Sequence, residues 1–405
     1  MFFFENTSHQ SFYDLILGKN TYIDKTSQIA TLYANHSKFE ILIRPWGFGK
    51  TLLLDTISFI FEKGLEHAIV EKLNIATTEV SIPRQLVVKL DFENSRTLTA
   101  ESFKNYLFSF YRSFLFEHNI PYNLSADMGS YWLTINFLRS ISTISPTGRI
   151  ILLIDNYDFP FFKHLAGKVN DFDQLYIELL NFYRAVYYSS DYLDWVLLCG
   201  EAKFNLSTEK HEGIPYLSDV SYSDQTTCLC GFSIKDLYKY YNDNIQDEAD
   251  ANNETVDSFL STICDWYGCY RFTPHNIQVT RPYSIKSYFS QYNTTTSFNQ
   301  FVPVERYADF LPVLLAKYGK VSDKMLAPND CGYTFAESLN PCNINLFALM
   351  SQLGIYSFNS ITLNKTPSFD RYKYVSRIVN REMDNCYRKL LDIAGKIPNS
   401  AIKNT

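Results

Sequence analysis

The feature that most constrains the fold is an alternation of short apolar runs with longer helical patterns over the first 235 residues. Five runs are nearly continuously apolar, at residues 39–43, 86–90, 150–154, 195–199 and 227–229. Such runs are typical of parallel strands that are buried on both faces of a sheet. Helical patterns lie between them, at residues 52–61, 102–116 and 172–187. The alternation therefore predicts an α/β domain in which helices cover both faces of a parallel sheet.

After this domain the sequence becomes mostly helical. Helical patterns occur at residues 234–242, 253–267, 284 onward, 311–318 and 344–352, and residues 373–391 end the ordered part. We expect three parts, which are the α/β domain at 1–235, a helical region at 236–320, and a small, mostly helical or winged-helix-like region with a polar tail at 321–405. A length of 405 residues, at roughly 150 per domain, also predicts two or three domains.

Composition and charge exclude several classes of protein. The chain is 46% hydrophobic and 20% charged, which predicts a large core and excludes wholesale disorder. With 37 basic and 43 acidic residues the formal net charge is −6, which argues against binding nucleic acid through bulk positive charge and leaves a local basic patch open. No run approaches the length of a membrane span, and the start of the chain lacks the pattern of a signal peptide. We therefore expect a cytoplasmic protein.

The cysteines and histidines suggest no metal site. Cys228-x-Cys230 and Cys264-x4-Cys269 have spacings that could imitate the two halves of a zinc site. Cys228 and Cys230, however, fall at the predicted strand 227–229, where both would point into a core. We expect the eight cysteines to be buried free thiols. The seven histidines show no paired spacing, and we assign them no catalytic role.

The chemistry begins where the first predicted strand ends. This strand leads into Arg44-Pro45-Trp46-Gly47-Phe48-Gly49-Lys50-Thr51, and a helical pattern follows at Leu52. A strand, a glycine-bearing loop, Lys-Thr and a helix form a cradle whose backbone N–H groups bind phosphate oxygens. Lys50 would reach the β- and γ-phosphates, and the Thr51 hydroxyl would ligate Mg²⁺. Arg44 stands where the strict pattern has glycine, so an ordinary turn with an exposed lysine is the alternative.

A second motif supports the first. The apolar strand predicted at residues 150–154 ends in Asp155-Asn156-Tyr157-Asp158. In P-loop ATPases an acid at the carboxyl end of such a strand holds Mg²⁺. The sequence between Lys50 and Asp155 leaves room for one further strand, which residues 86–90 supply. The two motifs in this order predict a P-loop NTPase domain of the ATPase branch that binds Mg²⁺ and ATP.

Five segments resemble a known family. They are 22–26 (YIDKT), 44–51 (RPWGFGKT), 153–158 (LIDNYD), 266–272 (WYGCYRF) and 281–284 (RPYS). They are similar to YVDKT, RPRRFGKT, LIDEYD, WYDGYRF and NPWS in the predicted AAA-ATPase-like family, whose members often carry a C-terminal PD-(D/E)XK nuclease. The resemblance implies an AAA-like ATP-binding domain followed by a helical lid, and it makes Arg44 usual for the family. No later Asp…Glu-x-Lys strand pair follows, so we expect the nuclease to be missing.

Two departures from the family pattern bear on catalysis. Asn156 stands where the family has glutamate, and Trp46 with Gly47 replaces a pair of arginines. The resemblance implies that this glutamate polarises the attacking water. An amide cannot accept the proton, so a general-base contribution of about 10²–10⁴-fold would be lost while binding survives. Substitution by Asp158, Glu93 or Glu201 is one alternative, and Asn156 as a plain surface turn residue is another.

Several residues beyond the loop are weaker candidates. The resemblance implies that Arg271 contacts the γ-phosphate, although pairing with Asp265 is the favoured alternative. Lys203 is a candidate phosphate sensor, and Asp24 and Lys25 would brace the edge of the pocket. A basic cluster could meet a phosphate backbone, although a solvated face is favoured. Its members are Arg371, Lys373, Arg377, Arg381, Arg388 and Lys389, of which Arg377, Arg381 and Arg388 would share one helix face.

These observations predict a nucleotide-dependent switch with weak or absent hydrolysis and a protein partner. Arg44 to Leu52, Asp24, Lys203 and Arg271 would contact the nucleotide, Thr51 and Asp155 the metal, and Asn156 and Asp158 would occupy the catalytic position. One rival is an interaction scaffold that has lost the nucleotide. The other is an active ATPase in a nucleic-acid-processing or defence system with a separate nuclease. Retention of Lys50, Thr51 and Asp155 counts against the scaffold, and the missing acid at 156 against the active ATPase.

Overall fold

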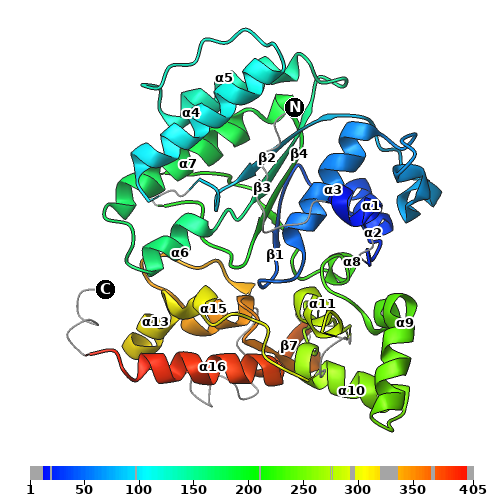
Figure 1. Ribbon diagram of the computed structural model, residues 1–405. Helices are drawn as coiled ribbons and strands as arrows, with labels where there is room; N and C mark the ends of the chain where they lie inside the picture. Colours follow the sequence, from blue (N-terminus) through cyan, green and yellow to red (C-terminus); the bar gives the residue numbers. More distant parts are fainter. Residues whose placement is uncertain are drawn as a thin grey trace.

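A five-stranded parallel sheet lies at the centre of the molecule (Figure 1). The computed structural model describes residues 12–18, 21–95, 98–208, 211–273, 275, 277–291, 297–319, 336–365 and 370–398. The strand order is β2-β3-β4-β1-β5. The strands are β1 (Phe39–Ile43), β2 (Leu86–Asp91), β3 (Ile150–Asp155), β4 (Leu193–Gly200) and β5 (Ser218–Asp219). Every side chain of β1 and β3 is buried, as expected for strands that are covered on both faces.

Helices cover both faces of this sheet (Figure 1). One face carries α4 (Ala100–Glu117), α5 (Ser130–Ser142) and α7 (Phe172–Tyr188), and the other carries α1 (Phe12–Leu17), α2 (Thr26–Ala34) and α3 (Lys50–Lys63). The short α6 (Phe159–Leu165) follows β3. Helix α4 begins with a capping box between Thr99 and Ser102, which satisfies free N–H groups of its first turn. The predicted α/β fold with helices on both faces is confirmed.

The strand predicted at residues 227–229 is wrong. Helix α8 (Asp224–Thr227) and a turn occupy this segment, and the fifth strand is the two-residue β5, which pairs with β1. The Ser223 side chain caps α8 by accepting from the N–H of Gln225. The buried guanidinium of Arg44 donates to the carbonyls of Ser221 and Thr226 on either side of this cap. These local hydrogen bonds hold the segment as a turn, against the preference of a short apolar run for a strand.

The cysteines are free thiols, as predicted, in the part of the chain that the structure describes. Their burial is uneven: Cys199, Cys230 and Cys386 are buried, whereas Cys342 is exposed. Cys331 lies outside the described residues. Within the described ranges, none of the helices is long and apolar enough to cross a membrane.

A second, mostly helical layer lies below the carboxyl ends of the strands (Figure 1). Its first part has an apolar core of its own, which includes Leu237, Ile263 and Ile285. This part consists of α9 (Ile234–Ala251), α10 (Val256–Tyr267) and α11 (Pro282–Phe289). Helices α12 (Glu305–Ala308), α13 (Leu311–Tyr318), α15 (Leu346–Gln352) and α16 (Arg381–Ala394) contribute to the main core instead. The boundaries at 235 and 320 stay predictions.

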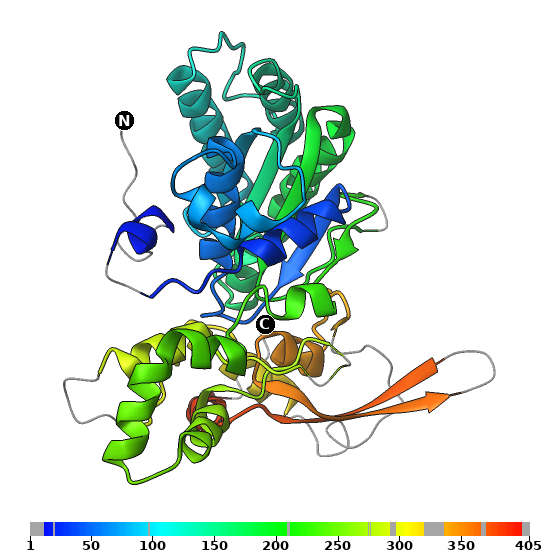
Figure 2. The ribbon, with the colours of Figure 1, turned by 90° about the vertical axis from the view of Figure 1, so that its right-hand side faces the viewer.

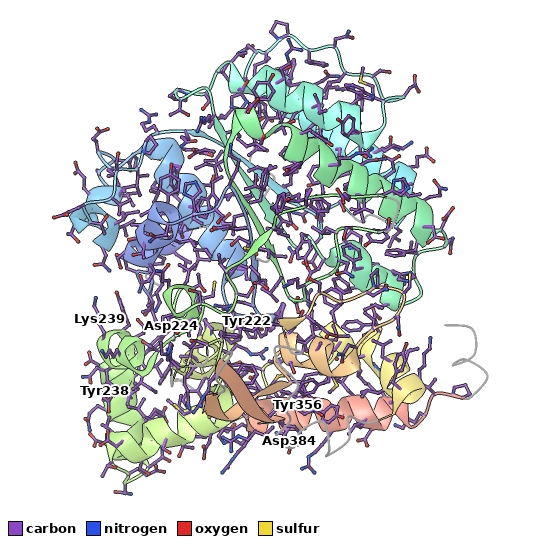
Figure 3. The ribbon with its side chains drawn as sticks, turned by 180° about the vertical axis from the view of Figure 1, so that it is seen from behind. Tyr222, Asp224, Tyr238, Lys239, Tyr356 and Asp384 are labelled. Atoms are coloured by element: carbon purple, nitrogen blue, oxygen red, sulfur yellow. The ribbon has the colours of Figure 1, made fainter. Side chains whose placement is uncertain are left out.

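The C-terminal region also contains an antiparallel strand pair, β6 (Tyr356–Lys365) and β7 (Asp370–Ile378), which projects from the body (Figure 2). The C-terminal region was expected to be mostly helical, but residues 370–378 form a strand, and Asn380 caps the helix that follows by accepting from the N–H of Met383. Figure 3 shows Tyr356, where β6 begins, and Asp384 on α16.

The predicted basic helix face does not exist, since Arg377 lies in β7 and Arg381 and Arg388 lie in α16. Of the other members of that cluster, Arg371 and Lys373 fall in β7 and Lys389 in α16. Arg388 pairs with Asp384 at 2.9 Å within α16, and Arg381 lies 3.9 Å from Asp265. The two arginines of α16 thus have acidic partners on the protein surface.

Candidate functional site

The loop between β1 and α3 has the backbone of a phosphate cradle. Gly47 and Gly49 adopt left-handed conformations, with φ of +80° and +86°, which glycine tolerates without a steric cost. At Gly47 a Cβ would also lie only 3.0 Å from the Cβ of Tyr283. Helix α3 begins at Lys50, directly after the second glycine, so its free N–H groups face the loop.

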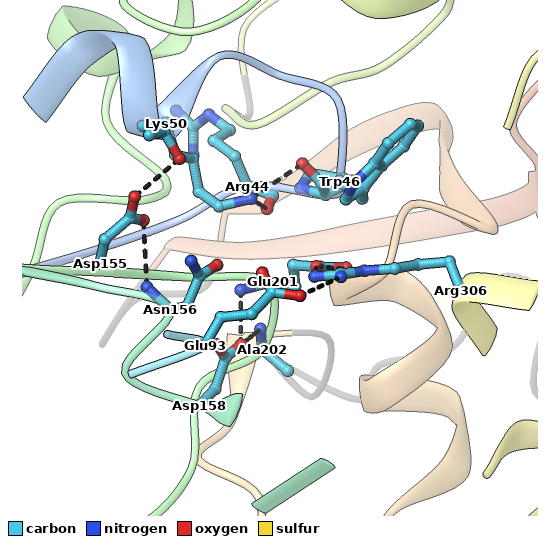
Figure 4. Close-up of polar contacts among 12 residues, drawn as sticks. Arg44, Trp46, Lys50, Glu93, Asp155, Asn156, Asp158, Glu201, Ala202 and Arg306 are labelled. Atoms are coloured by element: carbon cyan, nitrogen blue, oxygen red, sulfur yellow. Dashed lines mark hydrogen bonds and ion pairs between the residues drawn. The ribbon is translucent and has the colours of Figure 1, made fainter. Parts of the chain in front are cut away.

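Lys50 lies inside this loop. Its ammonium nitrogen donates to the carbonyl oxygen of Arg44 at 2.8 Å and to that of Pro45 at 3.2 Å (Figure 4). The side chain is 7% exposed, which differs from the alternative of an exposed lysine on an ordinary turn. Lys50 is thus held by neutral carbonyls, which a phosphate oxygen would outmatch because hydrogen bonds between charged groups are stronger.

Thr51 and Asp155 meet across 104 positions of sequence. The Thr51 hydroxyl donates to Asp155 Oδ2 at 2.7 Å, and Asp155 is completely buried at the end of β3 (Figure 4). A hydroxyl and a carboxylate are hard oxygen donors, which suit Mg²⁺, and Mg²⁺ usually binds through one or two such groups together with substrate phosphates. The residues present therefore fit the metal that the sequence predicted.

A cavity of about 510 Å³ opens around these groups, a size in the usual range for small-molecule sites. Lys50 and Thr51 line it. Ile23 from the N-terminal segment and Phe232 and Tyr241 from the helical layer line one part of it. Four polar or charged residues also line it, namely Glu93, Asn156, Glu201 and Arg306.

Comparison with known proteins agrees with this geometry. Residues 7–208 match the family described as "Predicted AAA-ATPase". This part of the chain belongs to the AAA-ATPase-like family. Membership implies a nucleotide-binding, ATPase-like function, and the match contains Lys50, Thr51 and Asp155. No curated protein matches the chain.

Asn156 of this AAA-ATPase-like domain is a site residue, in contrast to the alternative of a surface turn. Its backbone has a φ of +49°, and its N–H donates to Asp155 Oδ1 at 3.0 Å. Its side-chain amide donates to Asp91 Oδ1 at 2.9 Å. Burial raises the pKa of Asp91, the hydrogen bond from Asn156 opposes this, and the charge of Asp155 adds to it. The amide thus supplies a donor where a glutamate would add a further negative charge.

Asp158 is bound by the backbone. Its Oδ2 accepts from the N–H of Glu201 at 2.6 Å and from that of Ala202 at 2.8 Å, so it ties the end of β3 to the end of β4 (Figure 4). Burial, with the charge of Glu201, raises the pKa of Asp158 to about 7, although the N–H of Ala202 opposes the shift. Asp158 lines a smaller neighbouring cavity, not the one around Lys50.

Sequence reasoning missed Arg306, a cation on α12 that lines both cavities. Its Nε donates to Glu201 Oε1 at 3.0 Å, and its Nη1 lies 3.2 Å from Glu93 Oε1 (Figure 4). The only signal was indirect. The predicted lid, residues 236–320, contains three arginines, and only Arg271 and Arg281 lie in segments that resemble the family.

Arg271 and Lys203 do not line the cavity around Lys50. The N–H of Arg271 donates to Ser357 Oγ at 3.1 Å, and its side chain lines a small separate pocket. Its favoured alternative partner, Asp265, lies near Arg381 instead. Lys203 forms an ion pair with Asp219 at 2.7 Å.

Of Asp24 and Lys25, only Lys25 lines the cavity, so Asp24 does not lie where it was expected to contact the nucleotide. The Asp24 carboxylate accepts from the N–H groups of Thr26 and Asn74 at 2.9 and 2.8 Å. Lys25 lines the cavity and pairs with Asp236 at 2.5 Å, which connects the N-terminal segment to α9. Asp24 therefore acts through the backbone and Lys25 through an ion pair.

The remaining loop residues are divided between the cavity and the core. Trp46, Gly47, Phe48, Gly49 and Leu52 line the cavity, whereas Arg44 and Pro45 do not. The Arg44 guanidinium lies 4.1 Å from the ring centroid of Phe272, in addition to its hydrogen bonds with the α8 segment. Arg44 is therefore a structural residue.

The phosphate loop contacts segment 281–284, which also resembles the family. Arg281 Nη1 donates to the carbonyl of Trp46 at 3.1 Å, and the N–H of Tyr283 donates to the carbonyl of Gly47 at 3.1 Å. The rings of Trp46 and Tyr283 lie 4.5 Å apart between centroids. Segment 281–284 therefore supports the phosphate loop directly, which ties the helical layer to the nucleotide cavity.

Proposed function

We propose that this chain binds ATP with Mg²⁺ and acts as a nucleotide-dependent switch whose hydrolysis is slow. The observation that carries the proposal is the contact of Thr51 with Asp155 at 2.7 Å beside the buried Lys50, at the start of α3. Lys50 and the loop N–H groups would bind the β- and γ-phosphates. Thr51 and Asp155 would hold Mg²⁺, which when bound neutralises phosphate charge.

The switch would act through Arg306. Arg306 is paired with Glu93 and Glu201, and all three residues line the cavity together with Asn156. The γ-phosphate of ATP would compete with these carboxylates for the guanidinium, whereas ADP lacks that group. The position of α12, and of α13 and α16 packed against it, would then depend on which nucleotide is bound. A protein partner that reads this position is part of the proposal.

Slow hydrolysis follows from the residue at 156. An amide can orient a water molecule but cannot accept its proton. Asn156 also donates its side-chain N–H to Asp91, which occupies the amide. A nearby carboxylate would have to take the proton instead, and those at hand are bound by Arg306 or by the backbone.

A ligand-binding experiment tests the proposal. Saturation with ATP and Mg²⁺ at about 100 times the Kd should add roughly 2.7 kcal/mol to the free energy of unfolding. Lys50→Ala should lose most of this gain, and Lys63→Ala, in the exposed last turn of the same helix, should keep it. Equal stabilisation of the wild type and Lys50→Ala would contradict the assigned role of the lysine. No stabilisation of the wild type would favour the scaffold instead.

A further inference from the structure

Besides Asp91 and Asp155, which Asn156 contacts directly, the three carboxylates of Glu93, Asp158 and Glu201 line a cavity together with Asn156, and their contacts differ. Asp158 accepts two backbone N–H groups with one oxygen and does not line the nucleotide cavity. Glu201 lines that cavity, but its side chain is only 3% exposed and it binds Arg306 through both Nε and Nη2. Glu93 also lines the cavity, its side chain is 41% exposed, and it meets Arg306 through a single contact at 3.2 Å. Glu93 is thus the least constrained of the three.

Asp91 places Glu93 beside Asn156. Strand β2 runs parallel to β3 and pairs Asp91 with Asp155, so the two strands end side by side. Asp91 Oδ1 accepts from the side-chain amide of Asn156 at 2.9 Å and from the backbone N–H of Glu93 at 3.0 Å. One oxygen atom therefore fixes both residues at the same end of the sheet.

An asparagine at position 156 suits this cluster of carboxylates better than a glutamate would. A glutamate there would place its carboxylate against that of Asp91, whereas the amide of Asn156 donates a hydrogen bond to it. Like charges at this distance disfavour ionisation of both groups. The amide at 156 is therefore compatible with a cluster that already contains Asp91 and Glu93.

We propose that Glu93 is the general base for ATP hydrolysis in this chain, in place of the glutamate that is absent at 156. This inference rests on the proposed function. The water oxygen forms a bond to the γ-phosphorus, the bond from that phosphorus to the β,γ-bridging oxygen breaks, and ADP leaves with that oxygen. Glu93 takes the proton of the water and later releases it to solvent, so the products are ADP, phosphate and one proton.

Arg306 makes this reaction conditional. While Arg306 binds Glu93, the positive charge of its guanidinium offsets the negative charge of the carboxylate and weakens it as a base. When the γ-phosphate attracts Arg306, Glu93 is released at the moment that its substrate is present. Two contacts with Glu201 hold Arg306 beside Glu93. We therefore expect hydrolysis in the wild type to be slow but measurable.

The test measures phosphate release and ATP affinity together, for the wild type and Glu93→Gln. We expect kcat to fall by about 10- to 100-fold, at or below the lower end of a general-base contribution, and the Kd for ATP with Mg²⁺ to change little. Glu66→Gln, an exposed glutamate in the turn after α3, is the matched control and should leave both values unchanged.

The direction in which turnover changes in Glu93→Gln distinguishes a general base from a residue that only holds Arg306. If Glu93 only holds Arg306, removing its charge frees the arginine, and turnover in Glu93→Gln stays the same or rises, which would overturn the proposal. A wild type that binds ATP without releasing phosphate would also overturn it, and would leave the switch intact. A wild type that does not bind ATP would overturn the proposed function and this inference together.

Discussion

Glu382→Gln tests how helix α16 is connected to the phosphate loop. Glu382 is fully buried, and its carboxylate accepts from Ser284 Oγ at 2.9 Å and from the N–H groups of Phe301 and Val302 at 2.9 and 3.1 Å. Arg281, also fully buried, lies 3.9 Å from Glu382. The same guanidinium donates to the carbonyl of Trp46 in the loop. A buried charge pair thus links α16 to the nucleotide cavity.

The size of the effect follows from what glutamine keeps. Its amide oxygen can still accept from the two backbone N–H groups, so the main loss is the negative charge opposite Arg281. Removing one partner of a buried ion pair costs about 3–5 kcal/mol. Arg281 keeps the hydroxyl of Tyr270 and lies 5.7 Å from the ring centroid of Phe48, so we expect the lower end, about 3 kcal/mol. ATP affinity should fall as well, because Arg281 supports the loop.

Urea unfolding of Glu382→Gln and Asp384→Asn provides the measurement. Asp384 is on the same helix (Figure 3), and its pair with Arg388 at 2.9 Å is an exposed i,i+4 pair, worth about 0.3–0.5 kcal/mol. The control makes the same change of a carboxylate to an amide. If Glu382→Gln lost less than about 1 kcal/mol, or no more than Asp384→Asn, the buried pair would not stabilise the fold and the reasoning from Arg281 would fail.

Three further predictions concern the ends of β3 and β4. Arg306→Ala should weaken binding of ATP more than of ADP, and Arg271→Ala, outside the cavity, should affect neither; calorimetry that finds equal losses for both nucleotides would exclude a γ-phosphate contact. Asn156→Glu should raise phosphate release, but by less than the general-base factor of about 10²–10⁴, because the new carboxylate faces Asp91; unchanged turnover would remove Asn156 as the cause of slow hydrolysis. Because burial raises the pKa of Asp158 to about 7 when folded, against about 3.9 in the unfolded chain, the folded state holds a proton that the unfolded state releases. Stability should therefore fall as pH rises from about 4 to 7, and Asp158→Asn should flatten this part of the curve of unfolding free energy against pH; an unaltered slope would contradict the shift.

The sequence was sufficient for the parts of the site whose geometry is local. Lys50 and Thr51 are placed by strand β1, the two glycines of the loop and the start of helix α3, which follow one another directly in the sequence. Asp155 could be placed because the carboxyl ends of parallel strands lie at one edge of the sheet. The fold class followed from the same alternation of strands and helices.

The misplaced elements were those in which local hydrogen bonds outweigh the apolar pattern. At residues 227–229 the cap at Ser223 and the carbonyl contacts of Arg44 form a helical turn. The C-terminal region was expected to be mostly helical, whereas residues 370–378 form a strand and Asn380 caps the helix that follows. A charged residue can occupy a solvent-facing position in either a helix or a strand, so it does not indicate which of the two a segment forms.

Arg306 could not be identified because its partners come from distant parts of the chain. Glu93 lies 213 positions before it and Glu201 lies 105 positions before it. Nothing in the sequence around Arg306 indicates these contacts, since the segment lies outside the motifs that resemble the family. Arg271 lies within such a motif, and its backbone is tied to Ser357 instead of facing the cavity.

The absence of a glutamate at position 156 is therefore interpreted differently from the structure than from the sequence alone. In the sequence it is the loss of an acid, and it predicts a weakened ATPase. In the structure the position is surrounded by Asp91, Asp155 and Glu93, and the amide supplies the hydrogen-bond donor that their crowded negative charges require. If Glu93 is the base, as we propose, the site uses an acid beyond the end of β2 in place of one at the end of β3, and the ion pair with Arg306 controls it. Loss of one motif residue is thus a poor measure of lost chemistry until the charges of the neighbouring strands have been counted.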